Sequence, residues 1–427
     1  MNKLSVCKEL LNELVNLIDS PEFLKDFCAA KHFVRKRKLN LKQLICYLFY
    51  TSHASMNLNL ANIIDDIPEI NFPVISKQAV SKARMAVYPE LFRTLFQCSV
   101  QKLYHSDYLR KTWHGYHVFA IDGAKIQVPK TKDNIEYFGL CSNRHHSRED
   151  AMACISTLYD VLEDFIVDGV IQKYHKSERS AARTHLSNLE ALELTQKSVV
   201  LFDRGYPSFD FYKHFEEKQY FYLMRVQGKI KNLTQLGKQD AVTAFRPLNR
   251  KKEEPVKVRV VHVTLDDGTD ECLVTNIMDP TITVDMFKEL YFLRWGIESK
   301  YNELKNQLEL EEFSGSSHTS VEQDFFIRLL FMNICALIKS DADEKISEIQ
   351  KDTANKYHYQ ANRAFLIGRL QKHLAHLLSG FKDINYWVET LFEQAIKRRS
   401  QLQPDRKCKR PRIQLRRRHC NNRKTTT

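Results

Sequence analysis

The chain has 427 residues, of which 43% are hydrophobic and 27% are charged, and its formal net charge is +13. This length is enough for two to four domains with sizeable cores, and the composition excludes a chain that is disordered overall. The sequence contains no run of about 18 apolar residues, so we expect no membrane span, and its first residues lack the apolar block of a secretory signal.

The ten cysteines form no CxxC pair, and most of them lie in apolar runs such as LICYLFY and FMNICALI. We interpret them as reduced core residues of a cytoplasmic protein. No group of Cys and His residues has the spacing of a zinc site.

The positive charge is concentrated at the end of the chain. Residues 397–427 contain 13 Lys and Arg and one acid, or +12, whereas the rest of the chain is nearly balanced at +1. We expect this segment to be a flexible basic tail that binds a polyanion. The alternative is a solubilising tail without a specific partner. In both cases the tail indicates affinity for phosphates and does not define a chemistry.

Residues 1–110 are predicted to be helical. The stretch SKQAVSKARMAVY at 76–88 forms a short basic helix in this region. A short basic helix that follows a helix and a turn is typical of a DNA-reading module, and an ordinary surface helix is the alternative. One face of this predicted helix carries Gln78, Lys82 and Met85.

Near residue 116 the hydrophobic period changes from 3.6 to 2, which predicts a strand in YHVFAIDGAKIQVP. Asp122 lies at the apolar centre of this strand. An unpaired carboxylate is costly there, so we expect it to be paired, protonated or bound to a cation. A second acid, Asp203, follows the apolar run SVVLF. This run predicts a strand buried on both faces, with its acid at the carboxyl end.

The remaining elements alternate between strands and helices. Residues 228–282 are polar, with alternating strands in KVRVVHVTL and ECLVTNIMD and a turn at 266–268, and they predict a β-rich insertion. Residues 320–396 return to amphipathic helices. The other predictions are a hairpin at 154–172 with its turn near 162–164, helices at 177–196 and 209–219, and a strand at 220–226.

The stretch YFLRWGIESKYNELK at 291–305 is predicted to lie on one long helix that begins near Val284, is capped by Thr283 and ends at Gly315. At 100° per residue, four of its polar residues fall within an arc of about 60° beside an apolar stripe, the position of side chains at the edge of a cleft. Lys300 is expected on the far, solvated side. The alternative is a solvated i,i+4 pair worth ~0.3–0.5 kcal/mol. The four residues are Tyr291, Arg294, Glu298 and Lys305.

This order of elements places two carboxylates on neighbouring strands and a third, Glu298, on a helix packed against them. Three converging acids suit two hard divalent ions, with Mg²⁺ as the natural choice. Two such ions can serve an in-line displacement at phosphorus. Arg294 and Lys305 add donors that bind phosphates, and Tyr291 can bond to a phosphate or stack on a base.

The sequence resembles the bacterial insertion-sequence transposases of the DDE type, in the group with the Tyr-Arg-Glu-Lys signature (insertion-sequence family four). The resemblance spans about residues 33–310 and is carried by FVRKRKLNLKQLI, SKQAVSKAR, FAIDGAKIQVP, SVVLFDRGYPS, FYLMRV and YFLRWGIESKYNELK. It implies an α/β fold with an RNase H-like core, a mixed sheet with flanking helices, interrupted by a β-rich insertion. It also implies that Asp122, Asp203 and Glu298 are catalytic metal ligands for two Mg²⁺ ions, with Mn²⁺ as a substitute.

The resemblance further implies a set of DNA contacts. Some members of the family carry a Trp in the insertion that stacks on a flipped base during hairpin cleavage. No Trp occurs here between Asp203 and Trp295. Phe245 is the candidate replacement, so the use of a hairpin stays open. The DNA-binding residues that the resemblance implies are Tyr291, Arg294, Lys305 and Arg225. We also predict DNA contacts at Lys125, Lys77 and Arg84.

We therefore predict a cytoplasmic, nucleoid-associated bacterial transposase that excises and inserts an insertion sequence as a homodimer on DNA. The alternatives are a related nuclease without strand transfer and a non-catalytic DNA-binding protein of the same fold. The predicted division is an N-terminal helical DNA-binding domain (1–110), a core in two parts (111–227 and 283–318) around the insertion (228–282), a C-terminal helical region (319–396) and the basic tail (397–427).

Overall fold

A computed structural model describes the chain except for residues 31, 34–37, 52–53, 142–148, 195–196, 228–232, 234–236, 266–267, 352–356 and 403–427. Residues 266 and 267 of the predicted turn and most of the predicted basic tail lie outside the described residues. No described helix combines the length and apolar composition that a bilayer span needs. None of the eight described cysteines is in a disulfide, and seven of the eight are buried.

The first 104 residues form helices, most of which begin at a side-chain cap. Asn2, Asn40, Ser55 and Ser76 each accept a backbone N–H of the first turn, as N-cap residues do. The helices are α1 (Lys3–Asp19), α2 (Pro21–Lys25), α3 (Leu41–Tyr50), α4 (Met56–Asp66), the short 3₁₀ helix η1 (Pro68–Ile70), α5 (Lys77–Arg84) and α6 (Pro89–Tyr104).

A nine-stranded mixed sheet forms the centre of the molecule, in the order β2-β3-β1-β5-β6-β9-β8-β7, with β4 also paired to β3. β3 runs antiparallel to β1 and β4, whereas β1, β5 and β6 run parallel to one another. The strands are β1 (His117–Gln127), β2 (Leu140–Cys141), β3 (Asp150–Asp160), β4 (Phe165–Lys173), β5 (Ser198–Phe202), β6 (Phe221–Val226), β7 (Asp240–Phe245), β8 (Val256–Thr264) and β9 (Asp270–Thr275).

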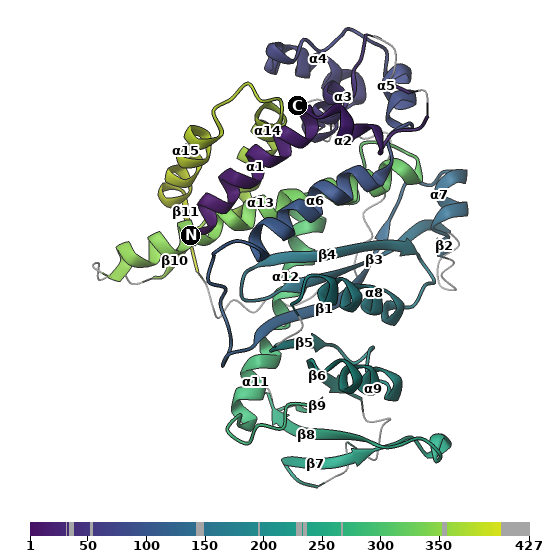
Figure 1. Cartoon of the computed structure of the whole chain (residues 1–427), viewed down its shortest axis with the longest axis vertical. Coiled ribbons are helices and arrows are strands. Elements are labelled where there is room, and N and C mark those ends of the chain that lie inside the picture. Colours follow the sequence, from purple (N-terminus) through teal and green to yellow (C-terminus); the bar gives the residue numbers. More distant parts are fainter. Residues whose placement is uncertain are drawn as a thin grey trace.

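The predicted elements of the central region are present. The β3–β4 hairpin turns at residues 161–164, and β5 is buried along its whole length, as its apolar run predicts. α8 (Glu178–Ala191) and α9 (Phe209–Lys218) supply the two crossovers, and α7 (Lys132–Tyr137) precedes the hairpin. α8 and α13 cover opposite faces of β4, because Asp168 bonds to α8 while neighbouring Gly169 lies against Leu329 of α13 (Figure 1).

The polar segment at 228–282 extends the central sheet. β9 pairs with β6, and β8 and β7 follow outward, so these three strands form one end of the molecule (Figure 1). Phe245 packs against Phe209 and Tyr212 and is only 7% exposed. The suggestion that Phe245 replaces a base-stacking Trp is therefore wrong for this conformation, because its ring is committed to the core.

The prediction of one continuous helix from Val284 to Gly315 is wrong. Thr283 does cap the start, but the chain forms α11 (Val284–Phe292), α12 (Trp295–Asn302) and a π-helical turn, η3 (Glu303–Gln307). Gly296 lies in the first turn of α12, where a Cβ would stand 3.3 Å from the Tyr159 ring. The break thus lets α12 approach the hairpin closely, which a larger residue at this position would hinder.

Lys300 is also placed differently from its prediction. Its side chain is only 2% exposed, and Nζ lies 2.6 Å from Asp164 and 2.9 Å from Glu303. Arg363 pairs with the same two carboxylates. An ideal helical wheel places Lys300 in solvent, whereas the real helix meets the acidic β3–β4 turn on that side.

The C-terminal helices pack directly on the N-terminal ones. α13 contacts α1 and α6, and α14 contacts α3, so both ends of the chain build one helical layer above the sheet (Figure 1). The elements are α13 (His318–Lys351), α14 (Arg363–Leu378), α15 (Ile384–Lys397) and the small ribbon of β10 (Tyr359–Ala361) with β11 (Arg399–Gln401).

A buried polar cluster joins this layer to the β3–β4 turn. Asp160 is 2% exposed and accepts hydrogen bonds from the Tyr104 hydroxyl (2.7 Å) and from two backbone N–H groups of the turn. Beside it, Lys3 and Glu163 form a buried ion pair of 2.7 Å. Burial, followed by the charge of Glu163, raises the pKa of Asp160 to about 7.

This pKa predicts a pH-dependent stability. Because the pKa of Asp in an unfolded chain is ~3.9, the folded protein holds a proton here that the unfolded chain has lost. Stability should therefore fall as the pH rises through this interval. Asp160→Asn removes this titration. The free energy of unfolding of the variant minus that of the wild type should therefore increase from about pH 5 to about pH 8. Urea titrations at each pH measure this difference. Asp107→Asn, at an exposed carboxylate, is the control; equal profiles for Asp160→Asn and the wild type would contradict the prediction.

Candidate active site

Asp122 is fixed through its backbone. Its carbonyl oxygen accepts hydrogen bonds from the Ser156 hydroxyl of β3 (3.0 Å) and the Tyr301 hydroxyl of α12 (2.7 Å). Its own carboxylate accepts the Gly123 N–H at 2.8 Å. Both carbonyl lone pairs are thus used, and β1, β3 and α12 together determine where the Asp122 side chain begins.

A second layer of polar residues holds Ser156. His185 of α8 lies 3.0 Å from the Ser156 hydroxyl through Nε2 and 2.7 Å from Asp168 through Nδ1. This order of Ser, His and Asp resembles a hydrolytic triad, but the three side chains are buried and Ser156 donates to the Asp122 carbonyl. The network therefore supports Asp122 and presents no nucleophile to a substrate.

Asp203 follows the last residue of β5 and faces two side chains from other elements. The Tyr291 hydroxyl donates to its carboxylate at 3.5 Å, and Nε of Arg225 lies 3.6 Å away. Arg225, on β6, also pairs with Glu271 of β9. The parallel pairing of β1 with β5 brings the loop that carries Asp203 to the side of Asp122.

Arg294 links the third acid to the first. Its guanidinium donates to Glu298 at 2.9 Å and lies 4.0 Å from Asp122, and the charge of Asp203 also acts on it. Arg294 and Tyr291 are 3% and 4% exposed, more deeply buried than a position at the edge of a cleft predicts. Two of the three predicted acids thus contact one buried cation, and the third acts on it through its charge.

The electrostatics of Asp122 reflect this crowding. Burial raises the pKa of Asp122 to about 6, with further increases from the charges of Asp203 and Glu178. The Gly123 N–H and Arg294 act in the opposite direction. A carboxylate in such surroundings gains from any additional positive charge placed near it.

Two predicted DNA-binding lysines lie together beside the acids. Lys305 donates to the carbonyl of Lys125 at 2.9 Å, and Lys125 donates to the carbonyl of Tyr174 at 2.8 Å. Burial lowers the pKa of Lys305. Both ammonium groups therefore stand half-buried along β1, past Asp122.

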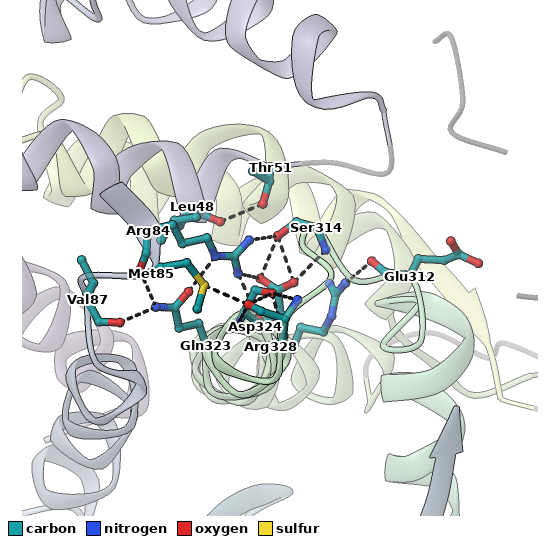
Figure 2. Close-up of polar contacts among 12 residues, drawn as sticks. Leu48, Thr51, Arg84, Met85, Val87, Glu312, Ser314, Gln323, Asp324 and Arg328 are labelled. Carbon is teal, nitrogen blue, oxygen red and sulfur yellow. Dashed lines mark hydrogen bonds and ion pairs between the residues drawn. The ribbon is translucent and has the colours of Figure 1, made fainter. Parts of the chain in front are cut away.

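Arg84 does not belong to this site. It is 4% exposed and pairs with Asp324 of α13 at 2.7 Å. Its other donors reach Gln323 and Ser314 (Figure 2). One also reaches the carbonyl of Ser320. The prediction that Arg84 binds DNA is wrong for this structure, because every face of the guanidinium is used inside the protein. Lys77, at the start of the same helix, is exposed.

The donor atoms of the site are carboxylate oxygens, which are the type of ligand that a hard divalent cation binds. Asp122, Asp203 and Glu298 offer carboxylate oxygens, and Mg²⁺ takes oxygen ligands of this type in proteins. In the part of the chain that the structure describes, no three Asp, Glu, His or Cys side chains are arranged as a ligand set. Arg294 instead supplies the positive charge between Asp122 and Glu298. A cation at this place requires the guanidinium to release at least one of them.

Several residues near the site were not identified from the sequence. Tyr301, His185 and Ser156 hold Asp122 from buried positions, and such residues look like ordinary core residues in a sequence. Glu178 lies next to Gly123, where a Cβ would stand 3.0 Å from its Cγ. The only sequence signal for this approach is the glycine that follows each Asp, in IDG and DRG.

Comparisons with known proteins identify the family of the chain. Residues 113–334, just over half of the chain, match the family model for the transposase DDE domain. Over 184 residues the chain is 26% identical to "Putative transposase InsZ" of Escherichia coli (strain K12), a match that covers 43% of this chain and 59% of that protein.

Among solved structures, the cryo-EM structure of a piggyBac transposase synaptic complex with hairpin DNA aligns at 9% identity with a TM-score of 0.49. This alignment covers 90% of this chain and 85% of that chain. Because the family model matches more than half of the chain, the chain belongs to the family of transposases with a DDE domain.

Proposed function

We propose that the chain excises and inserts a bacterial insertion sequence of family four, with Asp122, Asp203 and Glu298 as its catalytic residues. One observation carries this proposal. Acids on β1 and α12 contact the guanidinium of Arg294, and the charge of the acid that follows β5 acts on the same group. A structural role for each acid alone gives no reason for the three to act on the same group.

The strand order supports an RNase H-like core within this proposal. Three antiparallel strands, β4, β3 and β1, continue into the parallel strands β5 and β6 through helical crossovers. We propose that residues 111–227 and 283–318 form this core and that 228–282 is an insertion added at its β6 edge. Residues 1–110 and 319–396 would then form a shared helical platform for DNA, extended by the tail at 397–427.

Asp122, Asp203 and Glu298 would hold Mg²⁺, in two ions, or Mn²⁺ in its place. Bound divalent ions would lower the pKa of the attacking oxygen and stabilise the leaving one. The chain's own residues prepare the place for them. Two hydroxyls fix the Asp122 backbone, Tyr291 and Arg225 fix Asp203, and Arg294 aligns Glu298.

In the proposed reaction, water attacks a phosphorus at the element end, and the P–O3′ bond breaks to free a 3′-hydroxyl. That hydroxyl then attacks a phosphodiester of the target, forming one P–O bond and breaking another. Arg294 is the group best placed to exchange its carboxylate contacts for a phosphate oxygen, because its planar donors match either partner.

DNA binding would use basic residues beside the acids and in the N-terminal helical region. Lys125 and Lys305 lie beside Asp122, and Lys77 is exposed on α5. We propose that two copies of the chain bind paired element ends in the bacterial cytoplasm, at the nucleoid. Such contacts lose affinity steeply as the salt concentration rises.

The test is cleavage of a DNA that carries the element's own ends, in Mg²⁺, followed by joining to a target plasmid. We expect both cleavage and strand transfer. Cleavage without joining would favour a nuclease derived from such an enzyme, and specific binding without either would favour a non-catalytic DNA-binding protein.

A further inference from the structure

Glu178 is a fourth carboxylate at the acids. It is the first residue of α8, directly after the Ser177 cap. A Cβ built on Gly123 would lie 3.3 Å from Oε1 of Glu178, and one built on Gly205 would lie 3.9 Å from Oε2. Gly123 follows Asp122, and Gly205 lies two residues beyond Asp203. The Glu178 carboxylate therefore stands between the segments that carry the first two acids.

The Tyr206 hydroxyl provides an independent observation at the same place. Tyr206 is 1% exposed, and within the described ranges its hydroxyl has no hydrogen-bond partner. Burial, followed by the charges of Asp122 and Glu178, raises the pKa of this hydroxyl. A buried hydroxyl without a partner is costly, so Tyr206 has an unused donor near the charges of Asp122 and Glu178.

The first turn of α8 also fixes the loop after Asp203. Arg179 donates to the carbonyl of Gly205 at 3.1 Å and to that of Pro207 at 3.2 Å. These bonds hold the loop against α8 and so fix Tyr206 and Glu178 relative to each other. The start of α8, which carries Glu178, is thus held beside the loop that follows Asp203.

We propose that Glu178 completes the oxygen donor set beside Asp122 for a divalent cation, and that the Tyr206 hydroxyl donates a hydrogen bond to an oxygen bound there. This inference rests on the proposed function, because it adds a residue to the same metal site. The simpler alternative is that Glu178 only pairs with the positive end of the α8 dipole. That alternative predicts a change in stability without a change in metal affinity.

The test measures Mn²⁺ binding by the full chain, from the electron paramagnetic resonance signal of free Mn²⁺. Glu178→Gln should weaken the affinity at least about tenfold, and Tyr206→Phe should weaken it by a smaller factor, on the scale of groups that support a metal site. Glu217→Gln, the same change at an exposed residue of α9, should bind as the wild type does. Thermal melting confirms that each variant is folded.

If Glu178→Gln binds Mn²⁺ with wild-type affinity while Glu298→Gln loses affinity, this inference is overturned and the proposed metal site is kept. Absence of Mn²⁺ binding by the wild type would overturn the proposed metal site and this inference with it. If Glu178→Gln does not fold, Glu178→Asp takes its place, because it keeps the charge at the start of the helix but shortens the side chain. It should lose affinity about tenfold, and wild-type affinity in that variant would overturn the inference.

Discussion

Glu298→Gln should lose DNA cleavage by at least about a thousandfold, because residues that act as one catalytic unit lose most of their rate when a single member is removed. The amide keeps the size of the side chain and an oxygen that can accept from Arg294, now 2.9 Å from the carboxylate. It removes the negative charge that a metal ligand needs. The measurement is the initial rate of cleavage of DNA with the element's ends, at saturating Mg²⁺ and equal folded protein.

The matched control is Glu289→Gln, which makes the same change at an exposed residue of α11, nine positions before Glu298. We expect wild-type cleavage from this variant. Equal rates for Glu298→Gln and Glu289→Gln would remove Glu298 from the catalytic residues, and the proximity of Arg294 to the acids would then be only structural.

Arg84→Ala should lower the free energy of unfolding by roughly 3–5 kcal/mol, the range measured when one partner of a buried ion pair is removed. Its guanidinium makes four contacts of 2.6–3.0 Å with α13 and the segment just before it (Figure 2). Without it, the buried Asp324 carboxylate loses its ion-pair partner and keeps only the N–H and hydroxyl of Ser314. Urea unfolding at neutral pH measures the difference.

Lys77→Ala is the matched control on the same helix. Lys77 is exposed, so its removal should change stability by no more than about 0.5 kcal/mol. If it contacts a phosphate, the slope of DNA affinity against salt should fall by about one unit. An Arg84→Ala variant that keeps wild-type stability but loses DNA affinity would restore Arg84 as a DNA contact and contradict the structure's burial of its guanidinium.

The sequence predicted well wherever one local pattern decides the structure. The period of two around Asp122, the apolar run before Asp203 and the cap at Thr283 each give the observed element. Predictions that needed a partner from elsewhere were less reliable. Arg84 is basic on a basic helix, and its partners are distant in the sequence, such as Asp324, which lies 240 residues away.

The helix that carries Glu298 shows a second kind of limit. The helical-wheel analysis places Lys300 in solvent, but the acids of the β3–β4 turn pair with it. The same analysis predicts one unbroken helix to Gly315, but the helix is interrupted close to Gly296, which contacts the hairpin. Glu178 was missed for a related reason. An acid at the first position of a helix is common because of the helix dipole, so its nearness to Asp122 is visible only after folding.

The most direct test of the shared site uses iron as a local cutting reagent. Fe²⁺ bound in place of Mg²⁺, with ascorbate and hydrogen peroxide, cleaves the peptide backbone close to the ion. Fragments should end near residues 122, 203 and 298 in the same experiment, and excess Mg²⁺ should suppress all three cuts. The single substitution Asp122→Asn should abolish all three cuts. Cuts elsewhere, or cuts near 203 and 298 that persist unchanged in Asp122→Asn, would show that the three acids do not form one metal site.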